Sequence, residues 1–153
     1  MDTKILIITD DRDTKHMLVQ SLVRTKAWTL AIPTEPGALP SYLIQADLVI
    51  LDIPQADLQE FSLLKQIREV STVPIIGLVA SEDYRIGIGG LDRGADHVMV
   101  KPVDEQELRA RVRALLRRVQ AVREKSGGPW GAGPTSVREA GPAEASPSNT
   151  LLM

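Results

Sequence analysis

The residues of this chain that could do chemistry follow its apolar runs. They are Asp10, Asp11 and Asp13 after the run ILII, Asp52 after LVIL, and Lys101 after VMV. An aspartate at such a place commonly caps the next helix, and this reading fits each residue taken alone. Carboxylates from two strands together with one lysine also form an oxygen-rich pocket that suits Mg²⁺ and a phosphoryl group. Whether these residues meet depends on the segments that carry them.

Composition limits the other kinds of site. The 153 residues include no cysteine, so disulfides, zinc–thiolate sites and cysteine nucleophiles are excluded. His16 and His97 are expected to be surface residues, and any metal would be bound by oxygen. The net charge of -2 indicates neither a nucleic-acid surface nor a membrane surface. No apolar run approaches the length of a membrane span, which predicts a cytoplasmic protein.

Two alternating patterns predict the fold class. Apolar runs typical of buried parallel strands lie at residues 5–8, 28–32, 48–51, 73–80 and 98–100. Helical patterns lie between and after them, at residues 13–26, 34–45, 56–70, 83–93 and 105–122. The second is shortened by proline and the fourth is weakened by three glycines. The alternation predicts a doubly wound α/β domain, a five-stranded parallel sheet with helices on both faces, whose functional crevice lies beyond the carboxyl ends of the strands.

The composition changes near the end of the chain. From Ser126 onward Gly, Pro, Ala and Ser dominate, and no apolar period is present. Such a segment buries too little apolar surface to offset its ordering entropy. We predict one domain over residues 1–123 and a disordered tail over residues 124–153. The tail is too short and too irregular for a DNA-binding output domain, so no direct contact with nucleic acid is expected.

Four segments in order resemble a known family over residues 1–123. They are KILIITDD, ADLVILD, VPIIGLVA and GADHVMVKP, and together they resemble the receiver domain of two-component response regulators. The closing KPVDEQELRARVRALLRR looks most like the OmpR/PhoB class. The resemblance implies a flavodoxin-like receiver fold and a signalling domain rather than an enzyme. It also implies that Asp52 accepts a phosphoryl group from a sensor histidine kinase or a small phosphodonor.

The resemblance also implies roles for the residues at the strand ends. The metal would be Mg²⁺, and its ligands would be the carboxylates of Asp10 and Asp52 and the backbone carbonyl of Pro54, with Asp11 as a possible stand-in. Lys101 would contact the phosphoryl oxygens as a point charge. The Lys101–Pro102 peptide bond is expected to be cis, as is common in the family. Asp13 is expected to cap the first helix.

Three residues depart from the family pattern. Thr9 stands where the first of two adjacent acids is usual, unless the register slips by one residue and Asp11 compensates. The loss of one carboxylate is expected to weaken Mg²⁺ binding without abolishing it. Val79 replaces a serine or threonine that would bind the phosphoryl group, and Val98 replaces the switch aromatic. These departures predict altered output after phosphorylation.

The resemblance further implies a homodimer through the face formed by the helix at residues 83–93, the strand at 98–100 and the helix that follows. In the family pattern the acids Asp92 and Asp96 could meet the arginines Arg111, Arg113 and Arg118 across such a dimer. That face is only partly retained, because Gly87 replaces a usual arginine and His97 a usual acid.

Two functions remain open at this point. The first is a phosphoacceptor receiver domain with altered switching. The alternative is a pseudo-receiver that acts as a phosphorylation-independent docking or dimerisation module. A third class, a haloacid-dehalogenase-type phosphatase, needs an acid two residues after its nucleophile, where this chain has Pro54. The retained Asp10, Asp52 and Lys101 favour the first function, and the departures favour the second.

Overall fold

The protein is described by a computed structural model that covers residues 3–34 and 39–127. The chain divides into two units, residues 1–115 and 116–153, and the fold below is that of the first. Of the second unit, residues 116–127 are described and are helical. The tail predicted over residues 124–153 lies outside the described residues from 128 onward. No helix in the described part of the chain is long and apolar enough to cross a membrane.

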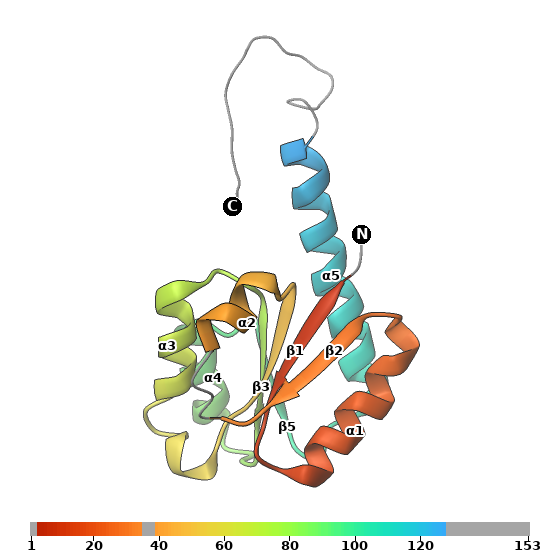
Figure 1. Ribbon diagram of the computed structural model, residues 1–153. Helices are drawn as coiled ribbons and strands as arrows, with labels where there is room; N and C mark the ends of the chain where they lie inside the picture. Colours follow the sequence, from red (N-terminus) through yellow and green to blue (C-terminus); the bar gives the residue numbers. More distant parts are fainter. Residues whose placement is uncertain (1–2, 35–38, 128–153) are drawn as a thin grey trace. The chain divides into compact units, whose positions relative to one another are not determined.

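The first unit is built on five parallel strands in the order β2-β1-β3-β4-β5 (Figure 1). The strands are β1 (Lys4–Ile8), β2 (Trp28–Ile32), β3 (Leu48–Asp52), β4 (Ile75–Val79) and β5 (His97–Val100). Every residue of β3 and β4 is buried, because helices cover both faces of the inner strands. The edge strands β2 and β5 are partly exposed. The predicted doubly wound α/β fold is confirmed.

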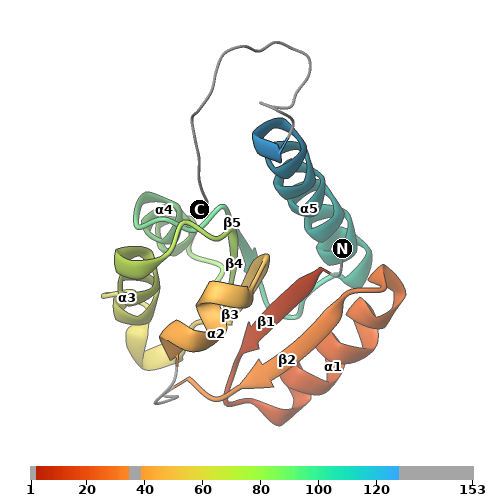
Figure 2. The same ribbon diagram turned by 45° about the horizontal axis from the view of Figure 1, so that its top comes forward.

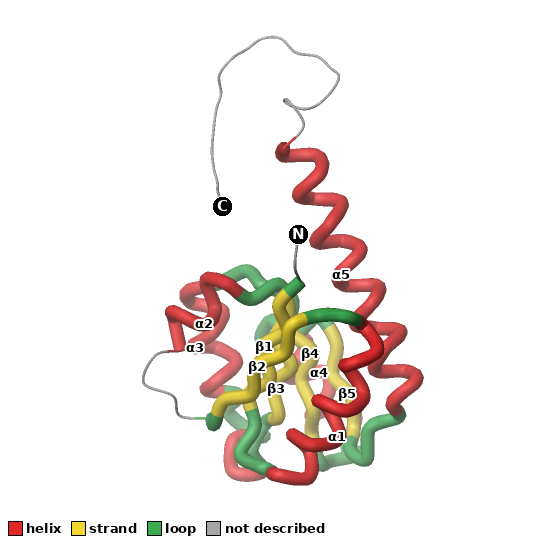
Figure 3. Tube along the Cα trace, turned by 45° about the vertical axis from the view of Figure 1, so that its right-hand side comes forward, coloured by secondary structure: helices red, strands yellow, loops and turns green. Residues whose placement is uncertain are grey.

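The helices cover both faces of this sheet (Figures 2 and 3). They are α1 (Arg12–Leu22), α2 (Leu39–Gln45), α3 (Ser62–Val70), α4 (Tyr84–Asp92) and α5 (Glu105–Gly127). Helices α2 to α4 lie on one face, and α1 lies on the other with the part of α5 before residue 116. On the first face, Leu6 and Ile8 share an apolar cluster with Leu43 of α2 and Leu64 of α3. On the second face, the Arg109 guanidinium donates to the Ser21 hydroxyl at 3.1 Å.

Helices α1, α3 and α5 differ from their predicted extents, and α5 runs to Gly127 rather than to residue 122. The helix α1 ends at Leu22 and is followed by a 3-10 turn, Val23–Thr25. The segment expected to be helical over residues 56–70 is divided into a 3-10 turn, Gln55–Asp57, and α3. The division arises because the Asp57 carboxylate accepts the Ser62 N–H at 2.9 Å. This bond starts α3 at Ser62, five residues after Asp57.

The glycines of α4 have different surroundings. A Cβ on Gly90 would lie 2.9 Å from Val98 Cγ2 and 3.3 Å from Phe61 Cε1, so α4 packs closely against β5 and Phe61 there. A Cβ on Gly89 would also lie within 3.2 Å of Phe61. A Cβ on Gly87 would meet no atom within 4 Å. The close approach of α4 to the sheet therefore requires Gly90, whereas Gly87 only weakens the helix.

We expect opposite effects from alanine at these two positions. Gly87→Ala should raise the free energy of unfolding by about 0.5–1 kcal/mol, because alanine limits the unfolded chain and adds no clash. Gly90→Ala should lower it by about 1–2 kcal/mol, because the methyl group overpacks the contact with Val98. Urea unfolding followed by far-UV circular dichroism measures both. A stabilising Gly90→Ala would contradict the packing described here.

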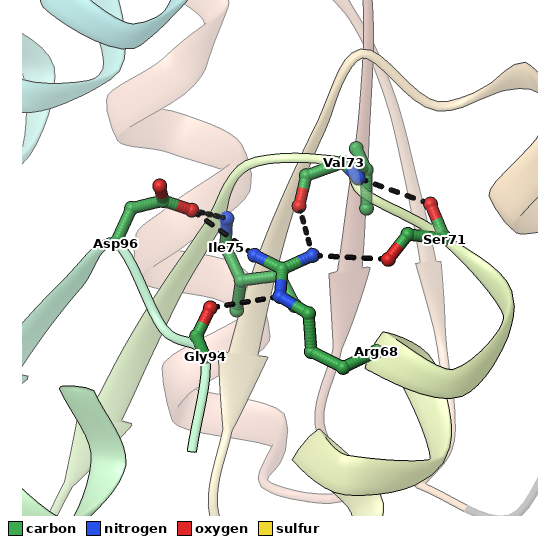
Figure 4. Close-up of polar contacts among 6 residues, drawn as sticks. All are labelled: Arg68, Ser71, Val73, Ile75, Gly94 and Asp96. Carbon is green, nitrogen blue, oxygen red and sulfur yellow. Dashed lines mark hydrogen bonds and ion pairs between the residues drawn. The ribbon is translucent and has the colours of Figure 1, made fainter. Parts of the chain in front are cut away.

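Arg68 joins three segments of the domain (Figure 4). Its Nε donates to the Gly94 carbonyl at 2.8 Å, and its Nη1 donates to the Val73 and Ser71 carbonyls at 2.5 and 3.3 Å. Its Nη2 lies 3.2 Å from Asp96 Oδ2. The same oxygen accepts the Ile75 N–H at 2.8 Å. Burial lowers the pKa of Arg68, and Asp96 opposes that shift. The side chain thus links α3 to the start of β4 and to the turn before β5.

Candidate functional site

The site lies at the carboxyl ends of the inner strands and centres on Asp52. This aspartate is the last residue of β3 and is 7% exposed. Ile7 of β1 pairs with Ile50 of β3, so the register places Thr9, two residues further along, beside Asp52. Lys101 follows β5 and donates its backbone N–H to the Val79 carbonyl at 2.8 Å. The sheet therefore brings Thr9, Asp52 and Lys101 together from three strands.

Both oxygens of the Asp52 carboxylate have a donor. The Lys101 ammonium lies 2.8 Å from Oδ1, and the Thr9 hydroxyl donates to Oδ2 at 2.6 Å. The Thr9 oxygen in turn accepts the Asp11 backbone N–H at 3.0 Å. Because Asp11 occupies an acceptor position on that oxygen, the single hydroxyl hydrogen is directed at Asp52. One ammonium and one hydroxyl thus satisfy the buried carboxylate.

Asp10 lies on the other side of the strand. Ile8 pairs with Ile32 of β2, so the register places Asp10 next to Thr34 rather than next to Asp52. The Thr34 N–H donates to Asp10 Oδ1 at 3.0 Å, and the Thr34 hydroxyl donates to Oδ2. These bonds, with the hydroxyl bond the larger cause, lower the pKa of Asp10 below its ordinary value. The exposed Asp10 carboxylate therefore accepts hydrogen bonds from Thr34 and belongs to the β2 side of the site.

Asp11 is the N-cap of α1. Its carboxylate accepts the Thr14 N–H at 3.2 Å and also the Thr14 hydroxyl, which lowers the pKa of Asp11. The prediction that Asp13 caps this helix was wrong; Asp13 lies inside the first turn. The Lys101 ammonium is 3.5 Å from the Thr14 hydroxyl oxygen. The Asp11 carboxylate is thus connected to the pocket through Thr14 and Lys101, and its backbone N–H through Thr9.

The oxygens predicted to bind a metal ion accept hydrogen bonds within the chain. Receiver domains typically bind Mg²⁺, which needs oxygen lone pairs directed at one point. The Pro54 carbonyl accepts the Asp57 N–H at 2.8 Å, and the carboxylates of Asp10, Asp11 and Asp52 accept the bonds given above. Within residues 3–34 and 39–127 no three acidic or histidine side chains form a group that could hold a metal ion. In this arrangement the residues do not fit Mg²⁺.

Val79 and Val98, the other two residues that depart from the switch pattern of the family, lie in or against the apolar core. Val79 is fully buried and belongs to the cluster on the α2–α4 face, while Val98 packs against that cluster. Neither side chain can donate a hydrogen bond. The Lys101–Pro102 bond is cis, as predicted.

Sequence reasoning missed Thr14 and Thr34. A search of the residues that follow every strand, including β2, would have found Thr34. The spacing of three residues from the N-cap would have found Thr14.

The face formed by α4, β5 and α5 contains charged residues that are paired within the chain. Arg111 contacts Glu107 at 2.7 and 2.9 Å and His97 Nδ1 at 3.0 Å. Asp96, one of the two acids expected to meet arginines of α5 across a dimer, pairs with Arg68 within the chain. Beside these pairs the face exposes large apolar side chains, Tyr84, Ile88 and Leu91 of α4 and Val100 of β5.

The strand order and the strand-end aspartate paired with a lysine define a flavodoxin-like α/β domain with its site at the carboxyl edge of the sheet. Comparison with known families gives the more specific result. The chain belongs to the response regulator receiver domain family, which it matches over residues 5–113. It is thus a receiver domain of two-component signalling.

Similar proteins agree with this assignment. The chain is 35% identical over 117 residues to the response regulator ArlR of Staphylococcus saprophyticus, covering 76% of this chain and 53% of that protein. It is 38% identical over 125 residues to the uncharacterized transcriptional regulatory protein YrkP of Bacillus subtilis, covering 82% and 54%. These relatives are OmpR-like regulators, as the sequence resemblance predicted. The chain spans about half the length of the curated relatives it matches.

Solved structures of the same fold are also similar. A two-component response regulator from Clostridium difficile has a TM-score of 0.68 and 30% identity, covering 76% of this chain and 98% of that chain. The Francisella response regulator 1452 receiver domain has a TM-score of 0.65 and 27% identity, with the same two coverages.

Proposed function

We propose that this chain is a phosphoacceptor receiver domain that takes a phosphoryl group on Asp52 from a sensor histidine kinase or a small phosphodonor in the cytoplasm. The observation that carries the proposal is the 2.8 Å ion pair between Asp52 and Lys101 at the carboxyl edge of the sheet. It places a nucleophilic carboxylate beside a cation that can move to the oxygens of an incoming phosphoryl group.

The transfer is a substitution at phosphorus. A carboxylate oxygen of Asp52 forms a bond to phosphorus, while the bond from phosphorus to the donor breaks. With acetyl phosphate the products are the aspartyl phosphate and acetate; with a phosphohistidine the imidazole leaves and takes up a proton. An Asp52 oxygen that keeps its contact with Lys101 or Thr9 attacks with its remaining lone pair and is a weaker nucleophile, because charge-assisted hydrogen bonds contribute about 1.5–3 kcal/mol each.

The adduct adds roughly 1.5–2 negative charges beside Lys101. The ammonium can follow the phosphoryl oxygens and partly neutralise them, since its Nζ already lies between Asp52 and Thr14. No hydroxyl at position 79 and no aromatic ring at position 98 are available to relay this charge to α4. The proposed output is therefore altered relative to receivers that carry both groups.

The second candidate is a docking or dimerisation module that works without phosphorylation. Two observations favour it: the Thr9 hydroxyl closes one oxygen of Asp52, and α4 and β5 expose Tyr84, Ile88, Leu91 and Val100. A homodimer through this face would bury those side chains. The Arg111–Glu107 pair, at 2.7 Å, would remain within each chain rather than cross the interface.

Incubation with acetyl phosphate, read by intact mass, tests the acceptor function. We expect a mass increase of one phosphoryl group, because the Asp52 carboxylate and the Lys101 cation are both in place. Hydroxylamine should remove the adduct, because it cleaves acyl phosphates but not phosphoserine or phosphothreonine esters. A chain that stays unmodified under excess donor would contradict the acceptor function and leave the docking module.

A further inference from the structure

The sequence predicts Mg²⁺ at the Asp52 carboxylate, whereas the structure has hydrogen bonds there. This difference originates at Thr9. We propose that Thr9 closes the Asp52 pocket to divalent cations, so that the resting pocket is held by a hydroxyl and an ammonium in place of a metal ion. The inference rests on the proposed function, because it concerns the same pocket. Its test is cation binding rather than phosphoryl transfer, so either proposal can fail while the other stands.

The first argument is the direction of the Thr9 hydroxyl. The hydroxyl donates to Asp52 at 2.6 Å while its oxygen accepts the Asp11 N–H at 3.0 Å. A cation at Asp52 would face the hydrogen of the Thr9 hydroxyl and not a lone pair of the Thr9 oxygen. Rotation of the hydroxyl toward a cation would break the bond to Asp52, and Thr9 is only 5% exposed, so water cannot readily replace that bond.

The second argument is the charge of the pocket. Asp52 and Lys101 carry opposite charges 2.8 Å apart, so the pair is neutral without a cation. Thr9 adds no charge, and the remaining strand-end acids are bound elsewhere, Asp10 by Thr34 and Asp11 by Thr14. A divalent cation would therefore meet one carboxylate that is already neutralised. Mg²⁺ dehydrates reluctantly and gains little from such a site.

The strand register makes position 9 decisive. Ile5 and Ile7 of β1 pair with Leu48 and Ile50 of β3. Two residues further along, the same register places Thr9 and Asp52 on the same face of the sheet. A carboxylate at position 9 would lie against Asp52 on the same face. Two adjacent carboxylates facing one lysine leave an excess negative charge, which a cation can balance. A single substitution should thus convert the closed pocket into a cation site.

Thermal unfolding of the wild type, Thr9→Asp and Thr9→Val, with and without about 10 mM MgCl₂ at matched ionic strength, tests the proposal. We expect the melting temperature of the wild type to change by less than about 1 °C on adding Mg²⁺. Thr9→Asp should melt lower than the wild type without Mg²⁺, because its carboxylates repel, and should gain about 4–8 °C with Mg²⁺. Thr9→Val removes the hydroxyl without adding a carboxylate, so it should melt lower than the wild type. Its melting temperature should rise with Mg²⁺ by less than half of the rise for Thr9→Asp.

Isothermal titration with MgCl₂ supplies an independent measurement on the wild-type chain, should Thr9→Asp fail to fold. We expect no saturable heat up to millimolar Mg²⁺. Saturable binding that disappears in Asp52→Asn would overturn the proposal, as would an equal gain in melting temperature for wild type and Thr9→Asp. A Thr9→Val chain that responds to Mg²⁺ as strongly as Thr9→Asp would overturn the requirement for a carboxylate at position 9.

Discussion

Asp52→Asn should give no phosphoryl adduct under conditions that modify the wild-type chain. The amide of asparagine is a poor nucleophile and carries no charge to attract Lys101, so both the attacking group and the pairing at 2.8 Å are lost. The substitution keeps the size of the side chain, and the Thr9 hydroxyl can still donate to the amide oxygen. We therefore expect a complete loss of the adduct without a loss of folding.

Asp57→Asn is the matched control for this experiment. Asp57 follows the same strand and undergoes the same change of charge, but its carboxylate accepts the N–H and hydroxyl of Ser62 at the start of α3. Its adduct should match that of the wild type in intact mass. An adduct on Asp52→Asn, or a loss of the adduct on Asp57→Asn alone, would move the acceptor away from Asp52.

Arg68→Ala should lower the free energy of unfolding by about 2–4 kcal/mol. The guanidinium donates to three backbone carbonyls, of Gly94, Ser71 and Val73, and pairs with Asp96. Its removal leaves those acceptors to find water in a partly buried turn, and each unsatisfied group costs about 1–3 kcal/mol. The melting temperature should fall by roughly 10 °C.

Two variants make this result specific to the network. Arg68→Lys keeps the charge but not the planar fork, so it should recover only part of the loss. Arg85→Ala removes an exposed arginine that pairs with Asp83 two residues earlier, and it should leave the melting temperature almost unchanged. Urea unfolding of the three variants measures the differences. Equal losses for Arg68→Ala and Arg85→Ala would mean that the backbone contacts of Arg68 contribute nothing.

The Arg68 network also shows what a sequence leaves open about the charges of the outer face. By the family pattern, Asp92 and Asp96 could meet Arg111, Arg113 and Arg118 across a dimer. Within the chain, Asp96 receives Arg68 at 3.2 Å and the Ile75 N–H at 2.8 Å, while Arg111 contacts Glu107 and His97. A sequence shows which charges are available for pairing. It does not show which of them a turn brings into contact.

The sequence by itself determined the fold class and the strand ends that form the site. Unbroken apolar runs such as ILII and LVIL can only be satisfied by burial on both faces of a sheet, and the parallel order then brings Asp52 and Lys101 to one edge. These features follow from local patterns that do not depend on register.

Only the tertiary structure decided how the acids are divided among partners. Because successive residues of a strand point to opposite faces, the pairing of β1 with β2 and β3 directs Thr9 to Asp52 and Asp10 to Thr34. Residues 5–8 of β1 are all apolar, so they carry no periodic signal for that choice. The role of Thr9 therefore depends on pairing between segments 43 residues apart.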